Sequence, residues 1–542
     1  MNLTKELHLG TFLFLVFICY LTFFRGLGDY GLWDPDEGRS GVIAKEIVAS
    51  GNWLTLSLNG EPYYDKPQLF FWLIALGIKL LGLNELAVRL PSALAASLTV
   101  GVVYLWGCAF GGWKWALWGG LVLATSMEFV AVGRFANMDM VFTFFFTAAL
   151  LSFLRWKQQR KGWIWLFYLF LALASLTKGP VGVFLPLLIV GITMGLRKSW
   201  ALLREMRLLP GLGMVVLISG SWYLLTALRD PEYIKTFLWN HNVLRFFIIQ
   251  PGIAHPEPIY YLFPVLMMGF LPWTFFLPPV LHNLWERRAE EGQEEKLFLM
   301  VWLTTVLIFF SLSRNKLGTY VLPAFPPLAL LTGDFIRQFM ERREVRPWRR
   351  RWILYASFAW LFFLLSLSPL GELTLRNRYP QYLPLNPGFF LSSTLIVFMV
   401  LAWFLRKERW TPWIVSFSSL WLVLWFYGVK APEISELRST RTLARIVKGN
   451  ATQEYRVVTI RAESFSFYLP NHVQVVSQSA MIESMLEESI PTIALVKEKH
   501  LEEMRQIHPS RLFVWKAVSS ARALVANFPL LPAQNLGRAP KD

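Results

Sequence analysis

Long apolar runs dominate the chain from residue 9 to residue 428. A helix that crosses the hydrocarbon core of a membrane needs roughly 20 apolar residues, so we expect about thirteen membrane-spanning helices. Their approximate ranges are 9–25, 87–109, 113–127, 137–154, 163–177, 180–196, 208–228, 259–281, 297–312, 318–337, 352–370, 388–405 and 412–428. These runs predict a mainly α-helical membrane domain over residues 1–429.

The pattern changes at about Lys430, where the hydropathy falls and short β-like runs begin, at Arg456–Ile460, Val473–Val476 and Thr492–Val496. Helical stretches separate these runs, which predicts a small C-terminal α/β domain over residues 430–542. This region contains no phosphate-binding loop and no cluster with metal-ligand spacing. We therefore expect it to serve acceptor handling or stability.

The composition agrees with a membrane protein. The 542 residues are 55% hydrophobic and only 16% charged, which lies outside the range of soluble globular proteins. Tryptophans stand at the ends of apolar runs, where the indole suits the headgroup layer, as at Trp33, Trp113, Trp163, Trp273 and Trp413. Both cysteines lie inside apolar runs and predict neither a disulfide framework nor a zinc site.

The formal charge of +17 raises the question of nucleic-acid binding. The cations gather instead in short loops between apolar runs, at residues 155–161, 197–207 and 342–351. Such loops are typical of the cytoplasmic face of a membrane protein. We therefore expect membrane lipids and no nucleic acid among the partners.

The topology depends on Leu69–Leu81, a run that is short for a membrane span. If this run does not span, all the basic loops fall on the cytoplasmic side with the N-terminus. The loop of residues 26–86 and the C-terminal region then lie outside. If it does span, residues 26–67 join the basic loops inside. We favour the first topology, because it keeps two acidic motifs on one side.

The first of these motifs is Asp34-Pro35-Asp36-Glu37-Gly38-Arg39, which precedes an amphipathic stretch that predicts a surface helix. Asp34 as N-cap, Pro35 at the first position and Glu37 in a capping box would explain the motif without any function. Asp36 is not needed for such a cap. It is therefore the stronger candidate for a catalytic carboxylate.

The second motif runs from Leu58 to Pro67, a turn-rich segment that places the acid Asp65 and the base Lys66 side by side before an apolar run. An exposed surface pair is the alternative. Asp139 is a third candidate, because a carboxylate at the edge of the hydrocarbon is costly and is often functional. A helix N-terminal acid stabilised by the helix dipole would also explain Asp139.

Cations are expected to be scarce on the outer side, so those predicted there are informative. They are Lys66, Lys178, Arg245, Arg314 and Lys316. Together they fit a site for a lipid-linked phosphate, although each alone is also explained as a solvated loop residue. His241 and His255 share one outer loop, but two histidines fourteen residues apart are a weak indication of a metal site.

These motifs together resemble the lipid A aminoarabinose transferase family, whose members are undecaprenyl-phosphate-sugar-dependent glycosyltransferases related to the protein O-mannosyltransferases. The resemblance is strongest over residues 29–108 and covers most of the membrane part. It rests on residues 36–39, 58–60, 64–67, 89–92, 138–139, 177–179, 245–246, 255–258, 269–273 and 316–323.

The resemblance implies roles for individual residues. Asp36 and Asp139 would be catalytic carboxylates with Glu37 beside them, while the carrier phosphate or substrate would be held by Arg39, Lys66, Lys178, Arg245, Lys316 and Tyr320. Asp65 and His241 would be the ligands of any divalent metal, which the sequence itself does not require. Asp65 stands where the family usually has Glu, Gly318 where it often has Pro, and Asn242 where some members have His. The first and last departures weaken the metal hypothesis.

The resemblance also implies a GT-C glycosyltransferase fold in the bacterial inner membrane, with the active site facing the periplasm. The predicted enzyme moves an aminoarabinose-like sugar from undecaprenyl phosphate to lipid A, another glycolipid or a protein. A protein O-mannosyltransferase-like enzyme and a polytopic lipid or sugar transporter are the alternatives, and a scaffold is a third. A transporter would place polar groups near the membrane midplane, whereas here they gather at outer helix ends.

Overall fold

The computed structural model describes most of the membrane part and the strands of the C-terminal part. The described residues are 2–160, 162–237, 256–287, 294–341, 348, 351–364, 408–450, 455–459, 463–469, 473–475, 481, 491–497, 513–518 and 522–527. The chain divides into two compact units that are not consecutive in sequence. The first, the membrane unit, comprises residues 1–27, 64–73 and 89–427, and the second, the loop–sheet unit, comprises residues 28–63, 74–88 and 428–542.

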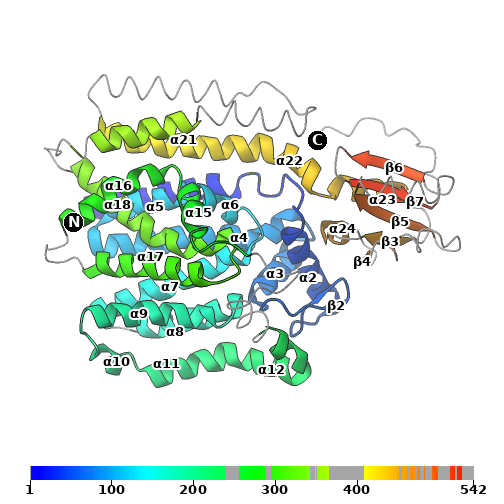
Figure 1. Ribbon diagram of the computed structural model, residues 1–542, viewed down its shortest axis with the longest axis horizontal. Coiled ribbons are helices and arrows are strands. Elements are labelled where there is room, and N and C mark those ends of the chain that lie inside the picture. The colour runs from blue at the N-terminus through cyan, green and yellow to red at the C-terminus, as the bar shows by residue number, and fades with distance from the viewer. Residues whose placement is uncertain are drawn as a thin grey trace. The chain divides into compact units, whose positions relative to one another are not determined.

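Apolar helices build the membrane unit. Its helices through Ile234 are α1 (Asn2–Cys19), η1 (Tyr20–Phe24), α4 (Glu85–Gly111, from Arg89 onward), α5 (Trp113–Ala124), α6 (Met127–Gly133), α7 (Met138–Gln159), α8 (Trp163–Lys178), α9 (Val181–Leu196), α10 (Leu202–Glu205), α11 (Leu208–Val215), η2 (Val216–Gly220), α12 (Ser221–Arg229) and α13 (Pro231–Ile234). They are followed by α15 (Leu262–Gly269), η4 (Trp273–Phe276), α16 (Leu277–Glu286), α17 (Glu294–Leu312), η5 (Gly318–Ala324), α18 (Phe325–Glu341), η6 (Glu408–Trp410) and α21 (Thr411–Trp425). Helices α7, α8 and α9 pack side by side (Figure 1).

The long helices show a multi-pass membrane protein. In the described part of the chain, six helices are long and apolar enough to cross a membrane. The number rises to as many as eight if each of two bent helix pairs counts as one span. Five shorter apolar helices accompany them, including Leu69–Leu81, which has 13 residues. The predicted span at 388–405 lies outside the described residues. The number of thirteen spans therefore stays a prediction.

One predicted span differs clearly from the structure. We expected a single helix over residues 259–281, but α15 and the helix over Trp273–Glu286 meet at an angle of 102°. Pro272 stands at the break, where its missing N–H and its ring interrupt helical hydrogen bonding. A second bend, of 69°, separates α5 from α6.

The two bends are bonded to each other. The backbone N–H of Met127 donates to the carbonyl oxygen of Leu271 at 3.0 Å. The indole Nε1 of Trp273 donates to Thr125 Oγ1, also at 3.0 Å, and Trp273 is fully buried. Polar groups freed at one break are thus satisfied by the other, as hydrocarbon surroundings require.

The loop–sheet unit begins with the segment that precedes the first long span. It contains α2 (Asp36–Ser50), the hairpin β1 (Ser57–Leu58) and β2 (Glu61–Pro62), and the second half of α3 (Leu69–Leu81). Asn59 and Gly60 connect the two strands with φ values of 55° and 83°. An Asn-Gly pair is the preferred sequence for such a turn, because both central residues need positive φ.

The C-terminal residues of this unit form a five-stranded sheet in the order β4-β3-β5-β7-β6. Its elements are η7 (Phe426–Lys430, from Gly428 onward), α22 (Ala431–Arg438), α23 (Arg441–Asn450), β3 (Arg456–Thr459), α24 (Glu463–Tyr468), β4 (Val473–Val475), β5 (Thr492–Lys497), β6 (Phe513–Val518) and β7 (Arg522–Ala526). β3 is parallel to β4 and β5, while β7 is antiparallel to β5 and β6. The three predicted strands are therefore confirmed, whereas the domain boundary at residue 430 stays a prediction.

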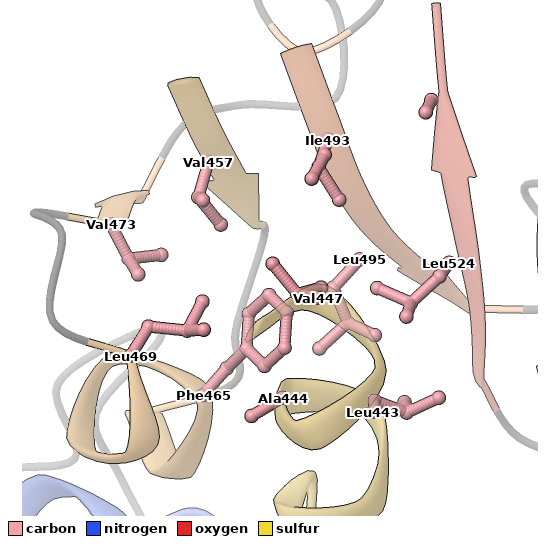
Figure 2. Packing of buried hydrophobic residues seen from close by; sticks show 11 residues of the cluster. Leu443, Ala444, Val447, Val457, Phe465, Leu469, Val473, Ile493, Leu495 and Leu524 are labelled. Carbon is pink, nitrogen blue, oxygen red and sulfur yellow. The ribbon is translucent and has the colours of Figure 1, made fainter. Parts of the chain in front are cut away.

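The core of the sheet lies between its strands and two helices. The strand residues Val457 and Ile493 face the helices (Figure 2). The helical side of this core consists of Phe465 in α24, Leu469 directly after α24, and Val447 in α23. All of these side chains are almost completely buried. Removing this apolar surface from water is what stabilises a sheet of short strands.

Candidate active site

Asp139 is held in the first turn of α7. Asn137 is the N-cap of this helix, and its side chain accepts a hydrogen bond from the Asp139 N–H at 2.7 Å. Asp139 is only 5% exposed. The positive end of the α7 dipole favours a carboxylate there. This position agrees with Asp139 being an acid at a helix N-terminus. It does not explain why the Asp139 side chain also contacts Lys178 and Thr319.

Lys178 is the direct partner of Asp139. It is the last residue of α8, and its Nζ lies 2.6 Å from Asp139 Oδ1. The acid stands at a helix N-terminus and the base at a helix C-terminus, so both dipoles favour the pair. The Thr319 hydroxyl, from η5, donates to Asp139 Oδ2. Both carboxylate oxygens of Asp139 are therefore engaged.

Aromatic rings surround the Lys178 ammonium. Its Nζ lies 4.1 Å from the ring centroid of Tyr320, 5.2 Å from that of Phe142 and 5.5 Å from that of Phe310. Ring faces attract a cation, most strongly where water is excluded. Two of the predicted site residues, Lys178 and Tyr320, are thus brought together with Asp139.

Two further predicted cations belong to the membrane unit. Lys66 is close enough to Asp139 for its charge to act on that carboxylate. Lys316 is 4% exposed, and its Nζ donates to the carbonyl oxygen of Glu257 at 2.7 Å. Burial lowers the pKa of Lys316, and the nearby charge of Arg314 acts in the same direction.

Tyr64 anchors the segment that carries Asp65 and Lys66. Its hydroxyl donates to Asp230 Oδ2 at 2.6 Å, and its ring packs against Tyr233. The hydrogen bond to Asp230 raises the pKa of Tyr64 to about 12. This anchor was not predicted from the sequence, because the two partners are 166 residues apart.

The predicted metal ligands receive no support from the described residues. Among these residues, no group of three or more His, Cys, Asp or Glu side chains converges as a metal site. Asp65 is described but is not part of such a group. His241, Arg245 and His255 lie outside the described residues.

Asp36, Glu37 and Arg39 belong to the loop–sheet unit. Asp36 opens α2, and its side chain is 63% exposed. Arg39 Nη1 lies 3.6 Å from Asp36 Oδ1, and Arg39 Nη2 lies 3.7 Å from Glu463 Oε1. Glu37 is fully buried and its Oε2 accepts a hydrogen bond from the Trp33 N–H at 2.9 Å. Of the two acids, Asp36 is the one that a substrate can reach.

The alternative explanation of Asp34 as N-cap of α2 is wrong. Pro35 occupies that position and makes no side-chain cap hydrogen bond. Asp34 instead accepts two hydrogen bonds at 2.7 Å, from the N–H and from the hydroxyl of Ser464. Ser464 is in the first turn of α24, where N–H groups lack partners within the helix. The Asp34 carboxylate therefore supplies the hydrogen-bond acceptor that a backbone N–H in the first turn of α24 lacks, although the two residues are 430 positions apart.

Gly38 allows this close approach. A Cβ atom at Gly38 would lie 2.3 Å from the backbone nitrogen of Ser464, and one at Gly41 would lie 2.8 Å from the ring of Phe467. The two glycines are three residues apart and so share one face of α2. This spacing was the available sequence indication that α2 packs closely against another backbone.

Known proteins resemble this chain over most of its length. Residues 65–223, which include Lys66, Asp139 and Lys178, match the family model of dolichyl-phosphate-mannose-protein mannosyltransferase. An uncharacterized protein of Aquifex aeolicus is 29% identical over 444 residues, which are 81% of this chain and 82% of the relative. The undecaprenyl phosphate-alpha-4-amino-4-deoxy-L-arabinose arabinosyl transferase 2 of Pseudomonas fluorescens is 34% identical over 413 residues, which are 74% of this chain and 69% of the relative. The chain belongs to this arabinosyl transferase family.

The fold agrees with that membership. The crystal structure of ArnT from Cupriavidus metallidurans bound to undecaprenyl phosphate matches with a TM-score of 0.81 and 22% identity, over 95% of this chain and 98% of that one. As an arabinosyl transferase family member, the protein is a polyprenyl-phosphate-sugar-dependent glycosyltransferase. The transporter and scaffold hypotheses are set aside on this ground.

Proposed function

We propose that this protein transfers 4-amino-4-deoxy-L-arabinose from undecaprenyl phosphate to lipid A at the periplasmic face of the bacterial inner membrane. The donor is the one in the printed names of the relatives, and lipid A is the acceptor that the sequence resemblance implies. The observation that carries the proposal is the buried Asp139–Lys178 pair. It lies within the segment matched by the family model and joins two helix ends.

The cations are proposed to act on the carrier phosphate. As the glycosidic bond breaks, the undecaprenyl phosphate leaves with increased negative charge. Cations near the leaving oxygen therefore stabilise the transition state more than the bound donor. Lys66 and Lys316 are the proposed contacts among the described residues, and Arg245 is proposed from the sequence resemblance.

Lys178 is proposed to act together with Asp139. Because the ammonium is already paired and enclosed by rings, its charge is fixed in place before a donor arrives. A fixed charge need not reorganise during the reaction, which is the advantage of a preformed electrostatic site. In this role the pair fixes the field around the sugar phosphate.

Asp36 is proposed as a catalytic carboxylate whose role depends on the acceptor. A hydroxyl acceptor needs a base, and an exposed carboxylate can take its proton. A phosphate of lipid A is already a nucleophile, so Asp36 would then orient the sugar or stabilise positive charge developing at its anomeric carbon.

The C-terminal residues 430–542 are proposed to position Asp36. The hydrogen bonds from Ser464 to Asp34 and the ion pair from Arg39 to Glu463 fix the first turn of α2 from both sides of Asp36. Lys45 adds a third link, because its Nζ donates to the carbonyl oxygens of Ser466 and Leu469 at 2.8 and 2.5 Å. The basic-loop bias supports a periplasmic location for both segments.

The proposal is tested by mass spectrometry of lipid A from a bacterial strain that lacks its own aminoarabinose transferase but makes the donor. Expression of this protein should restore lipid A carrying the amino sugar, and the Asp139→Asn variant at equal membrane abundance should not. Unmodified lipid A with the wild-type protein present would contradict the proposal. Sugar found on proteins instead would identify the protein as a mannosyltransferase-like enzyme, the alternative that the family model favours.

A further inference from the structure

Glu128 is a carboxylate near Asp139 that the proposed function has not used. It lies in the first turn of α6, directly after the bend that follows α5. The charge of Asp139 acts on it, which places the two carboxylates within electrostatic range. We did not predict a role for Glu128, although an acid in an apolar stretch is visible in the sequence.

Two glycines leave room for the Glu128 side chain. A Cβ atom at Gly269, the last residue of α15, would lie 2.1 Å from Glu128 Oε2. A Cβ atom at Gly318, the first residue of η5, would lie 3.9 Å from Glu128 Oε1 and 4.0 Å from the Tyr261 hydroxyl. The carboxylate therefore lies where α6, α15 and η5 meet. Residue 319, next to Gly318, is the threonine that donates to Asp139.

Glu128 has no cationic partner in the described part of the chain. Its Oε2 is buried and makes no hydrogen bond to any described residue. Two buried acids of the membrane unit are by contrast paired with cations: Asp139 has Lys178 and Thr319, and Asp334 has Lys296 at 2.8 Å and Arg337 at 2.6 Å. A buried carboxylate oxygen without a hydrogen-bond partner is costly, and a bound ligand would supply the partner that Glu128 lacks among the described residues.

The local charges show which ligand fits. The Lys178 ammonium is already bonded to Asp139, and the charge of Lys66 also acts on Asp139. Both of these cations therefore serve Asp139, and neither is paired with Glu128. A primary ammonium group bound at Glu128 would supply such a cation through a charge-assisted hydrogen bond, whereas a sugar hydroxyl would not.

We propose that Glu128 binds the protonated amino group of the donor sugar and so selects an amino sugar over its hydroxyl counterpart. This inference rests on the proposed function, since it assigns the amino group of that donor to one residue. The carrier phosphate lies elsewhere in the donor and has its own cations. Glu128 is therefore a specificity residue and contributes little to holding the lipid carrier.

The test compares two undecaprenyl-phosphate-linked donors in purified protein, one with 4-amino-4-deoxy-L-arabinose and one with L-arabinose. Glu128→Gln keeps the shape but removes the charge. It should lower kcat/KM for the amino donor by roughly 10- to 100-fold, because hydrogen bonds to charged groups are the stronger ones, and leave kcat/KM for the hydroxyl donor within about twofold. Glu341→Gln removes a carboxylate that pairs with Lys114 and Arg337 and serves as the matched control.

Binding of undecaprenyl phosphate without any sugar reports whether the Gln variant is folded, because this ligand has no amino group. We expect wild-type affinity for it. Equal losses on both sugar donors, lost affinity for the bare carrier, or unchanged use of the amino donor would each overturn the role of Glu128. A wild-type protein that transfers neither sugar would instead refute the proposed function, so the two failures are distinguishable.

Discussion

Asp34 accepts two hydrogen bonds from Ser464, each 2.7 Å long, across 430 positions of sequence. Ser464 is fully buried and also bonds to Thr440 at 2.8 Å. This relationship ties the segment that carries Asp36 to helix α24 of the C-terminal sheet. Mutations in the sheet should consequently affect transfer even though they touch no substrate.

Asp34→Ala should lower the transfer rate and loosen α24. It removes a side chain that acts as the N-cap of α24, and losing such a cap costs about 0.5–2 kcal/mol. Limited proteolysis of the C-terminal region and the rate of transfer should change together. Asp29→Ala is the control, because Asp29 is exposed and, among the described residues, it is its backbone carbonyl oxygen that accepts a hydrogen bond, from Arg441. If both variants behave like the wild type, the positioning role of the sheet is wrong.

The Asp139–Lys178 pair allows stability to be separated from activity. Lys178→Met leaves Asp139 buried without its counter-ion, which costs about 3–5 kcal/mol. The double variant with Asp139→Asn removes both charges and should regain most of that stability in thermal unfolding. We expect neither variant to transfer sugar. Activity in the stable double variant would show that the pair has only a structural role.

Lys316 gives the site a pH dependence. Burial holds its pKa below the ordinary lysine value, so its positive charge is present at lower pH and is lost as the pH rises through the lowered pKa. As the pH is raised, binding of undecaprenyl phosphate should therefore begin to weaken at a lower pH than it would if Lys316 had the pKa of an ordinary lysine. Lys316→Arg should shift that decline upward, since guanidinium stays protonated. Identical alkaline profiles of the two proteins would exclude Lys316 as the titrating cation.

The topology is tested by cysteine labelling in intact spheroplasts. After Cys19 and Cys108 are replaced, single cysteines at Asn59 and Asn450 should both react with a thiol reagent that cannot cross the membrane. Residue 59 lies in the β1–β2 turn and residue 450 at the end of α23. Labelling at only one of the two positions would place residues 26–86 and 430–542 on opposite sides.

Short-range patterns predicted much of this molecule, because they depend on neighbours in sequence. The spans of α7 and α8 follow from apolar length, and strands β3, β4 and β5 from short β-like runs. The turn at Asn59–Gly60 lies in the segment that was expected to be rich in turns. Asp139 was predicted as a site residue because a carboxylate at the edge of the hydrocarbon is costly, and Lys178 because cations are expected to be scarce on the outer side. Their pairing in the structure connects two separate predictions.

Long-range contacts could not be predicted in the same way. Asp34 stands where the sequence predicts the cap of the following helix. Only the folded chain shows that Asp34 caps α24 and not α2. The surroundings of Glu128 could not be predicted, because only the bend before α6 brings it beside Gly269 and Gly318. The break at Pro272 was missed because average hydropathy does not distinguish a straight span from two bonded half-helices.

The most direct test of the central claim is transfer by the purified protein in lipid vesicles. The vesicles contain undecaprenyl phosphate-4-amino-4-deoxy-L-arabinose and lipid A, and mass spectrometry follows both. Wild-type protein should convert lipid A to the aminoarabinose-modified form with release of undecaprenyl phosphate, and the Lys178→Met/Asp139→Asn variant should give neither product. Intact donor and unmodified lipid A after incubation with folded wild-type protein would contradict the account.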